Sequence, residues 1–225
     1  MLEFMKNLGA GVLEESYRAV PEYKEYESVD FNLPEALRYA GMPAHSAPQA
    51  GKDAVFDALE EIGGDLFYKV GFLCMYLQWD EEGFPVLPFA QHSELLKKNL
   101  RGCEGVILFA ATIGSGVDRY IRRYERSEVS KAAILQGLGA ERVESLCNCF
   151  NEEVKRMASE NHLKAHPRFS PGFGDLPISV QKEFLGALDA TRRMGITLSE
   201  SFLMAPSKSV TAIIGLERIP DNGGE

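Results

Sequence analysis

The chain has 225 residues, of which 45% are hydrophobic and 25% are charged, and its formal net charge is -9. This length and composition suffice for a substantial buried core, so we expect one domain spanning residues 1–225. The negative charge excludes a general affinity for nucleic acid, because such affinity needs clustered cations. Glu3 and Lys6 interrupt the apolar N-terminal stretch, so the sequence predicts neither a secretory leader nor a membrane span, and we expect a cytoplasmic protein.

The N-terminal half mixes helical and extended patterns. Apolar residues recur at helical spacing in residues 34–39 and 53–67, which predicts two helices leading the chain. Residues 69–79 and 84–89 are rich in branched and aromatic side chains on either side of a Glu-Glu-Gly turn, which predicts neighbouring strands. Two prolines in the second segment indicate an edge strand.

The middle of the chain has clear boundary signals. Ser93 is a suitable N-cap for a helix reaching Leu100, and the unbroken apolar run of residues 105–112 predicts a strand buried on both faces. After the Gly114-Ser115-Gly116 turn, a two-sided helix follows, and then the longest helix over residues 127–162. The arginines that share one face of the two-sided helix are Arg119, Arg122, Arg123 and Arg126.

The C-terminal part reads as one helix followed by strands. Residues 179–194 have helical spacing and are stopped by Gly195, and residues 196–219 alternate as two strands around Ala205-Pro206-Ser207. Strands and helices interleave without a regular β-α rhythm, and no repeat is visible. The sequence therefore predicts an α+β fold with a mostly antiparallel twisted sheet flanked by helices.

Two patterns imitate known sites. Cys147 and Cys149 with His162 and His166 have nearly the order of a zinc finger, but a continuous helix would separate the two pairs by roughly 20 Å, which is too far for one zinc ion. We expect free thiols, no disulfide and no metal. The Gly114-x-Gly116 turn suggests a Rossmann unit, but no following strand ends in an acidic residue, so an ordinary turn is favoured.

Two other readings concern charge and catalysis. The four arginines form either a solvated face or a docking face for an acidic partner, and the solvated face is favoured because Glu125 and Glu128 lie nearby. No Ser-His-Asp arrangement has supporting spacing, so no catalytic side chain is assigned.

The segment of residues 168–175 has the features of a ligand-binding loop. Its prolines and glycines predict a turning backbone that presents amides and carbonyls. Arg168 is suited to a carboxylate, because its planar fork can donate two parallel hydrogen bonds, and Gly172 lets a ligand approach the backbone. The alternative is a structural loop in which Arg168 pairs with a nearby acid such as Asp175.

Two separate blocks carry a family resemblance. The run Arg168-x-Ser170-Pro171-Gly172-Phe173, with Pro177 and Lys182 after it, resembles the Arg-x-x-x-Gly-Tyr region of the cobalamin-dependent methionine synthase activation domain. Leu198-Ser199-Glu200-Ser201-Phe202-x-Met204-x-Pro206, followed by Ser209-Val210, is similar to that family's Leu-Thr-Glu-Ser-Phe-x-Met-x-Pro block. Weaker similarity lies around residues 37–39 and 111–114.

The resemblance implies a binding site for S-adenosylmethionine. It places Arg168 on the methionine carboxylate and gives the ligand backbone contacts at Ser170. Phe173 stands beside Gly172 where the family has tyrosine, so a hydroxyl contact is not implied for this chain. The residues assigned to the ligand on this basis are Arg168, Ser170, Gly172, Phe173, Asp175 and Glu200, and Asp30 is a guess for a further acidic group near the N-terminus.

The function implied is that of an accessory subunit. Such a domain holds S-adenosylmethionine for the reductive methylation of cob(II)alamin on a separate methionine synthase, with a flavodoxin-like reductant. The chemistry needs alignment and exclusion of water rather than a general base. The alternatives are reactivation of another corrinoid methyltransferase, or a non-catalytic module that senses S-adenosylmethionine or binds a corrinoid protein.

Overall fold

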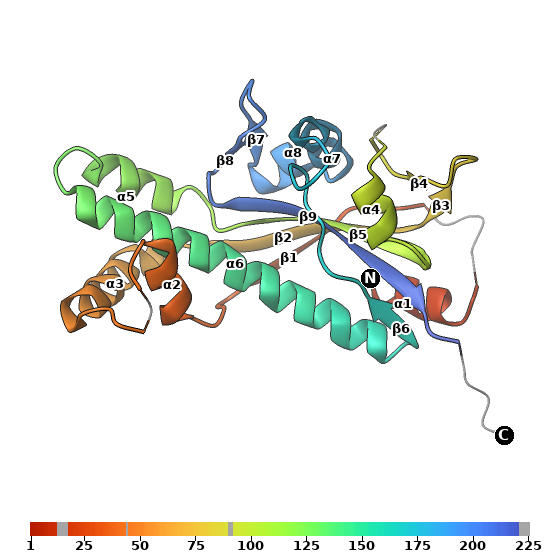
Figure 1. Ribbon diagram of the computed structural model, residues 1–225, viewed down its shortest axis with the longest axis horizontal. Helices are drawn as coiled ribbons and strands as arrows, with labels where there is room; N and C mark the ends of the chain where they lie inside the picture. Colours follow the sequence, from red (N-terminus) through yellow and green to blue (C-terminus); the bar gives the residue numbers. More distant parts are fainter. Residues whose placement is uncertain (13–17, 44, 90–91, 221–225) are drawn as a thin grey trace.

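The computed structural model describes residues 1–12, 18–43, 45–89 and 92–220. At its centre lies a five-stranded sheet with the strand order β1-β2-β5-β9-β6, in which all neighbours are antiparallel (Figure 1). The strands are β1 (Glu22–Tyr26), β2 (Tyr68–Tyr76), β5 (Cys103–Thr112), β6 (Leu163–Ala165) and β9 (Ser209–Arg218). This arrangement confirms the predicted α+β fold with an antiparallel sheet.

Strand β5 is the centre of the sheet. It pairs with β2 on one side and β9 on the other, so that Leu108 lies opposite both Leu73 and Ile213. Every residue of β5 except Glu104 is buried, because both faces of the sheet are covered. The apolar run of residues 105–112 therefore indicated the position of this strand correctly.

Helices packed on one face form the larger core. These are α1 (Leu2–Gly9), α2 (Leu33–Tyr39), α3 (Gln49–Ile62), α5 (Gly116–Tyr124) and α6 (Val129–Ser159). Figure 1 shows α6 crossing this face along much of its length. Its Phe150 ring contacts Phe72 of β2 at 5.4 Å and Phe109 of β5 at 5.0 Å, measured between ring centroids. Aromatic contacts thus hold the longest helix to the sheet.

The N-terminal elements differ in part from the prediction. Helix α1 and strand β1 precede the two predicted helices, so the chain does not begin with those. Helix α3 ends at Ile62, and a short 3-10 turn η1 (Gly63–Asp65) follows. Two consecutive glycines cannot sustain a helix well, because they lose the most backbone entropy. Phe67, predicted as helical, lies outside the helix with an exposed ring.

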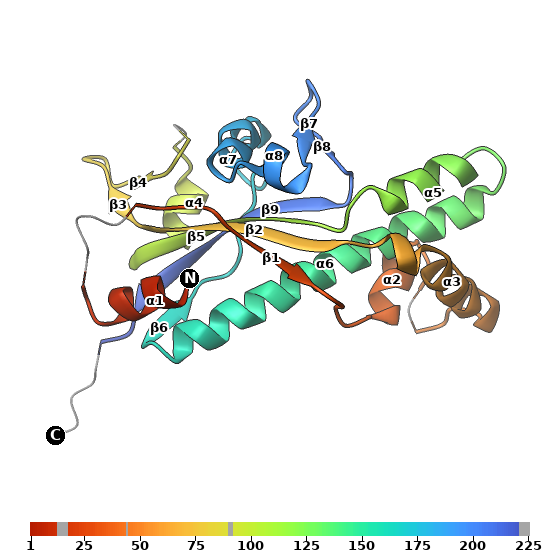
Figure 2. The same cartoon turned by 180° about the vertical axis from the view of Figure 1, so that it is seen from behind.

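A second core lies on the opposite face, seen from behind in Figure 2. It is built by α4 (Glu94–Asn99), the 3-10 turn η2 (Ile178–Val180), α7 (Gln181–Ala187) and α8 (Ala190–Met194). The prediction of one helix over residues 179–194 is wrong. The chain breaks at Asp189, whose φ of 46° is left-handed, and the Tyr23 hydroxyl donates to the carbonyl of Leu188 at 2.6 Å.

Two short ribbons complete the fold. Strand β3 (Gln78–Trp79) pairs with β4 (Pro85–Val86), which confirms that the two predicted segments are neighbours, although the first is interrupted at Leu77. Strands β7 (Thr197–Leu198) and β8 (Met204–Ala205) form a hairpin that projects beside α8 (Figure 1). The C-terminal part therefore has three strands instead of two. None of the described helices is both long and apolar enough to cross a membrane.

Candidate functional site

The segment of residues 168–175 leads from β6 toward α7 and is anchored at its start. Phe169 is buried, and its backbone exchanges hydrogen bonds of 2.9 and 2.8 Å with Ile213 of β9. Beyond it the chain turns: the amide of Gly172 donates to the carbonyl of Leu176 at 2.9 Å. Gly172 has a φ of 85°, a conformation that favours glycine. This confirms the predicted turning backbone.

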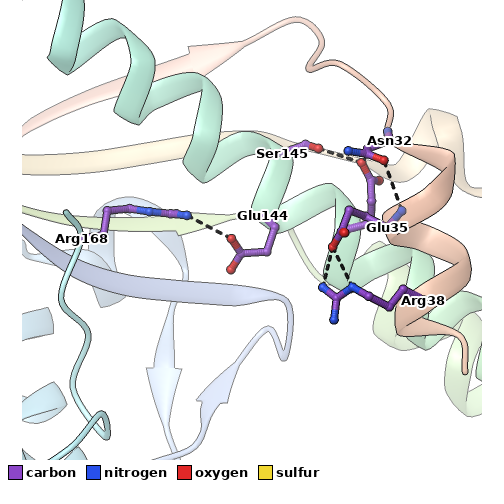
Figure 3. A network of polar contacts seen from close by, with 7 residues as sticks. Asn32, Glu35, Arg38, Glu144, Ser145 and Arg168 are labelled. Carbon is purple, nitrogen blue, oxygen red and sulfur yellow. Dashed lines mark hydrogen bonds and ion pairs between the residues drawn. The ribbon is translucent and has the colours of Figure 1, made fainter. Parts of the chain in front are cut away.

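Arg168 extends from this segment to helix α6. Its Nη2 donates to Glu144 Oε2 at 3.2 Å and to Asn148 Oδ1 at 3.0 Å. Figure 3 shows the guanidinium and the Glu144 carboxylate pointing toward each other. The alternative in which Arg168 pairs with a nearby acid is therefore confirmed in kind, but the acid is Glu144. The example given, Asp175, is wrong, because Asp175 binds the N-terminus of α4 instead. Glu144 and Asn148 were not predicted as site residues.

Asp175 binds the N-terminus of α4. Its carboxylate accepts hydrogen bonds from the hydroxyl of Ser93 and, at 2.7 Å, from the backbone amide of Glu94. The Ser93 hydroxyl in turn accepts from the Leu96 amide at 3.0 Å, which confirms Ser93 as the N-cap. The Ser93 hydrogen bond is the main reason that the pKa of Asp175 is lowered. Asp175 therefore has a structural task in the loop.

The other residues assigned to the ligand differ in exposure. Ser170 is half-buried, and its carbonyl accepts from the Phe173 amide at 3.1 Å, which closes the turn. Phe173 leaves 64% of its surface exposed, and its ring meets Phe169 edge-to-face at a centroid distance of 5.4 Å. An exposed phenyl ring at this place offers an apolar surface to a partner molecule.

A groove of about 750 Å³ lies beside Arg168, between α6 and the connection from β1 to α2. One wall is formed by residues 28–34, and the other by Ser145, Asn148, Cys149 and Glu152 of α6. Asn148 is shared, because it lines the groove and accepts the hydrogen bond from Arg168. Arg168 is therefore linked to the groove through Asn148, and Asp30 lies in the groove wall.

A buried ion pair holds the two walls together. Glu141 and Arg142 of α6 have side-chain exposures of 1% and 4% and form an ion pair with each other. The Glu141 carboxylate also accepts from the Asn32 amide at 2.9 Å, and Arg142 donates to the Asp30 carbonyl at 2.7 Å. Sequence reasoning missed this pair.

A signal for Arg142 was present in the sequence. It occupies a buried position in the apolar stripe of α6, four residues after Leu138 and four before Leu146. A charged residue inside such a stripe indicates a buried partner, since an isolated charge is costly to bury.

Glu200 lies apart from the groove. It is exposed in the connection between β7 and β8, and no residue of that hairpin lines the groove. The family-like block to which Glu200 belongs forms the hairpin itself, in which the Ser199 hydroxyl accepts from the Leu203 amide at 3.1 Å. The structure thus brings Arg168, Ser170 and Phe173 together in one segment and leaves Glu200 outside it.

The patterns that imitate other sites have structural explanations. Within the described ranges, no three His, Cys, Asp or Glu side chains are grouped so that they could bind a metal ion. Cys147 is buried, and burial raises the pKa of its thiol to about 12. Gly114 turns the chain from β5 into α5, and both neighbours of β5 are antiparallel, unlike a Rossmann unit.

The arginine face is exposed and partly paired. Arg119 forms an ion pair with Asp65 at 2.8 Å, and the guanidinium of Arg123 lies over the Tyr124 ring at 5.4 Å from its centroid. Arg122 lines a different pocket of about 610 Å³ between α5 and the β7–β8 hairpin.

Both the architecture and the sequence of this chain are similar to those of known proteins. The crystal structure of the MetH reactivation domain bound to AdoHcy is similar, with a TM-score of 0.59 and 15% sequence identity over 93% of this chain and 81% of that chain. No curated protein matches the sequence. The family model of the vitamin B12 dependent methionine synthase activation domain matches residues 92–218, more than half of the chain. The chain belongs to the family of vitamin B12-dependent methionine synthase activation domains.

Proposed function

We propose that this protein binds S-adenosylmethionine in the groove beside Arg168 and supports the reductive methylation of cob(II)alamin on a separate cobalamin-dependent methionine synthase. The observation that carries the proposal is the guanidinium of Arg168, which donates to Asn148 in the lining of a groove of about 750 Å³. Family membership supports the same reading, as does the similarity to a reactivation domain that binds AdoHcy. We take residues 1–225 as one such domain, because that similarity covers 93% of the chain.

The groove fits an amino acid joined to a flat base. Its volume lies in the range of about 300–1,000 Å³ that small-molecule sites occupy. Arg168 would hold the carboxylate through charge-assisted hydrogen bonds. The connection of residues 28–34 would offer backbone amides and carbonyls to the base edge, together with the side chain of Asp30. These groups match the chemistry of S-adenosylmethionine, and the proposed binding mode needs neither a metal ion nor a catalytic base.

The chemistry asks the protein for positioning. S-adenosylmethionine, when bound, supplies an electrophilic methyl group to a reduced corrinoid. The residues of this chain would orient the ligand and exclude water from the face that meets the partner. Phe173 carries no hydroxyl, so it would contribute an apolar cover at that face.

The partners would be a cobalamin-binding module, which carries the cobalamin, and a flavodoxin-like reductant. The exposed arginines of α5 would suit an acidic reductant, because charge complementarity accelerates association. Charge reversal at Arg122 and Arg123 should then weaken the binding of the reductant. It should also make that binding less sensitive to salt concentration.

Two other functions remain as alternatives. The corrinoid partner could belong to another methyltransferase. The protein could also sense S-adenosylmethionine without supporting catalysis, and the phenyl ring of Phe173 favours this alternative because the family has a phenol there.

The test is calorimetry with S-adenosylmethionine, with and without a cobalamin-loaded partner, on wild type and Arg168→Ala. We expect binding by wild type and at least about a tenfold loss in the variant, equal to the loss of a charge-assisted hydrogen bond. Single-turnover methyl transfer to cob(I)alamin then separates reactivation from sensing. Absence of binding by wild type in both settings, or equal binding by the variant, would overturn the proposal.

A further inference from the structure

Glu144 and Arg168 present opposite charges side by side next to the groove: Arg168 donates to the lining residue Asn148, and Glu144 directly precedes the lining residue Ser145. Their side chains keep 37% and 24% of their surfaces exposed, so both can reach a ligand. The two residues come from separate elements, α6 and the segment after β6, and meet at 3.2 Å (Figure 3). An adjacent, partly exposed cation and anion match the two charges of an α-amino acid, whose ammonium and carboxylate share one carbon atom.

We propose that Glu144 is a specificity-determining residue that accepts a hydrogen bond from the α-ammonium group of the ligand, while Arg168 holds its carboxylate. This inference rests on the proposed function and adds the group that distinguishes a ligand with an amine from one without it. On binding, the ligand carboxylate takes the place of Glu144 at the guanidinium, and Glu144 takes the ammonium. No charge is left without a partner in this exchange.

The other glutamates near the groove are already engaged. Glu141 is fully buried and accepts hydrogen bonds from Arg142, Ser145 and the Asn32 amide. Glu153 accepts from Lys24 at 2.6 Å and from Tyr26 at 2.8 Å, and Glu152 pairs with Lys155 at 2.7 Å. In the described part of the chain, Glu144 instead pairs with Arg168, the residue that the ligand would engage.

Asp30 and Glu152 are the two acids that line the groove itself, and Asp30 remains to be considered. Its carbonyl accepts from Arg142, which fixes its backbone, but its carboxylate makes no hydrogen bond to Arg168 in the described structure. The partners of an α-ammonium and an α-carboxylate must lie next to each other, because the two groups share one carbon. Glu144 meets this condition through its direct contact with the guanidinium, so we assign the ammonium to Glu144 and leave Asp30 to the rest of the ligand.

The test compares S-adenosylhomocysteine with its analogue that lacks the α-amino group, S-adenosyl-4-thiobutyrate, by calorimetry on the full chain. Wild type should bind the amine-bearing ligand at least about tenfold more tightly, the ratio expected for one charge-assisted hydrogen bond. Glu144→Gln should bring the two affinities within about threefold of each other, because it removes the carboxylate that accepts from the ammonium group and would be left unpaired by a ligand without an amine.

The matched control is Glu160→Gln, which removes an exposed acid at the end of the same helix, outside the groove lining, and should keep the wild-type ratio. Equal affinities of wild type for the two ligands would overturn the inference without any variant. So would an unchanged ratio in Glu144→Gln. If wild type binds neither ligand, the proposed function fails as well, whereas binding with no preference for the amine overturns the role of Glu144 alone.

Discussion

The side chains of Glu141 and Arg142 form an ion pair inside helix α6, with 1% and 4% of their surfaces exposed. Each also binds the backbone that leads into α2: Glu141 accepts from Asn32, and Arg142 donates to the carbonyls of Val29 and Asp30. The pair therefore fixes one wall of the candidate groove to the other. Its loss should affect both stability and ligand binding.

Arg142→Met should lower the free energy of unfolding by about 3–5 kcal/mol, because it leaves the Glu141 carboxylate buried without its cation. Urea denaturation measures this change. The double variant with Glu141→Gln should recover part of the loss, since no net charge then remains buried. A loss below about 1 kcal/mol for Arg142→Met would contradict the structure.

Gly137 of α6 lets α2 approach closely. A Cβ there would lie 2.4 Å from the backbone nitrogen of Ala40, so Gly137→Ala should destabilise the protein by about 1–3 kcal/mol through overpacking. Gly186 of α7 is the matched control, because a Cβ there meets nothing within 4 Å. Gly186→Ala should stabilise by roughly 0.5–1 kcal/mol. Equal effects of the two substitutions in thermal denaturation would disprove this difference.

Asp175→Asn should lower the melting temperature at pH 7 and leave the affinity for S-adenosylhomocysteine nearly unchanged. The hydrogen bond from Ser93 and those from the α4 amides lower the pKa of Asp175 in the folded state. A lowered pKa contributes stability above the unfolded value of about 3.9, which is lost as the pH falls through the folded value. The melting temperatures of wild type and variant should therefore converge in acid. Asp57→Asn, at an exposed position of α3, serves as the control.

Cys149 should be the cysteine that reacts first with iodoacetamide. It is half-buried and lines the groove, whereas Cys74, Cys103 and Cys147 are buried and have pKa values raised to about 12 by that burial. Burial also raises the pKa of Cys149, so the reaction should be faster at alkaline pH. S-adenosylhomocysteine should slow the labelling of Cys149, measured by mass spectrometry. Labelling at the same rate with and without ligand would argue against this groove as the site.

Local signals were sufficient for much of the fold. The apolar run of β5 and the Ser93 cap of α4 identified their elements, because burial and capping are visible within a few residues of sequence. The break in the helix at Asp189 was missed because its partner is distant in sequence. The Tyr23 hydroxyl, 165 residues away from Leu188, donates a hydrogen bond to the Leu188 carbonyl at this break.

The candidate site was predictable only in the segment that carries Arg168. The family-like motif marked Arg168 and Phe173, but motif similarity did not distinguish a ligand contact from the structural cap made by Asp175. Glu144 and the groove walls depend on contacts between α6 and residues more than 20 positions away. Such contacts leave no local pattern in a single sequence.

Helix α6 carries the buried Glu141–Arg142 pair as well as Glu144 and Asn148. The same continuous helix contacts α2 at Gly137. From Gly137 to Ser145 the helix rises about 12 Å along its axis, at 1.5 Å per residue. The spacing between the walls is thus governed by a glycine more than two turns away from the groove. Substitutions that widen the contact between α2 and α6 should change ligand affinity although they alter no residue of the groove lining. Ligand affinity and the packing of these two helices are therefore coupled.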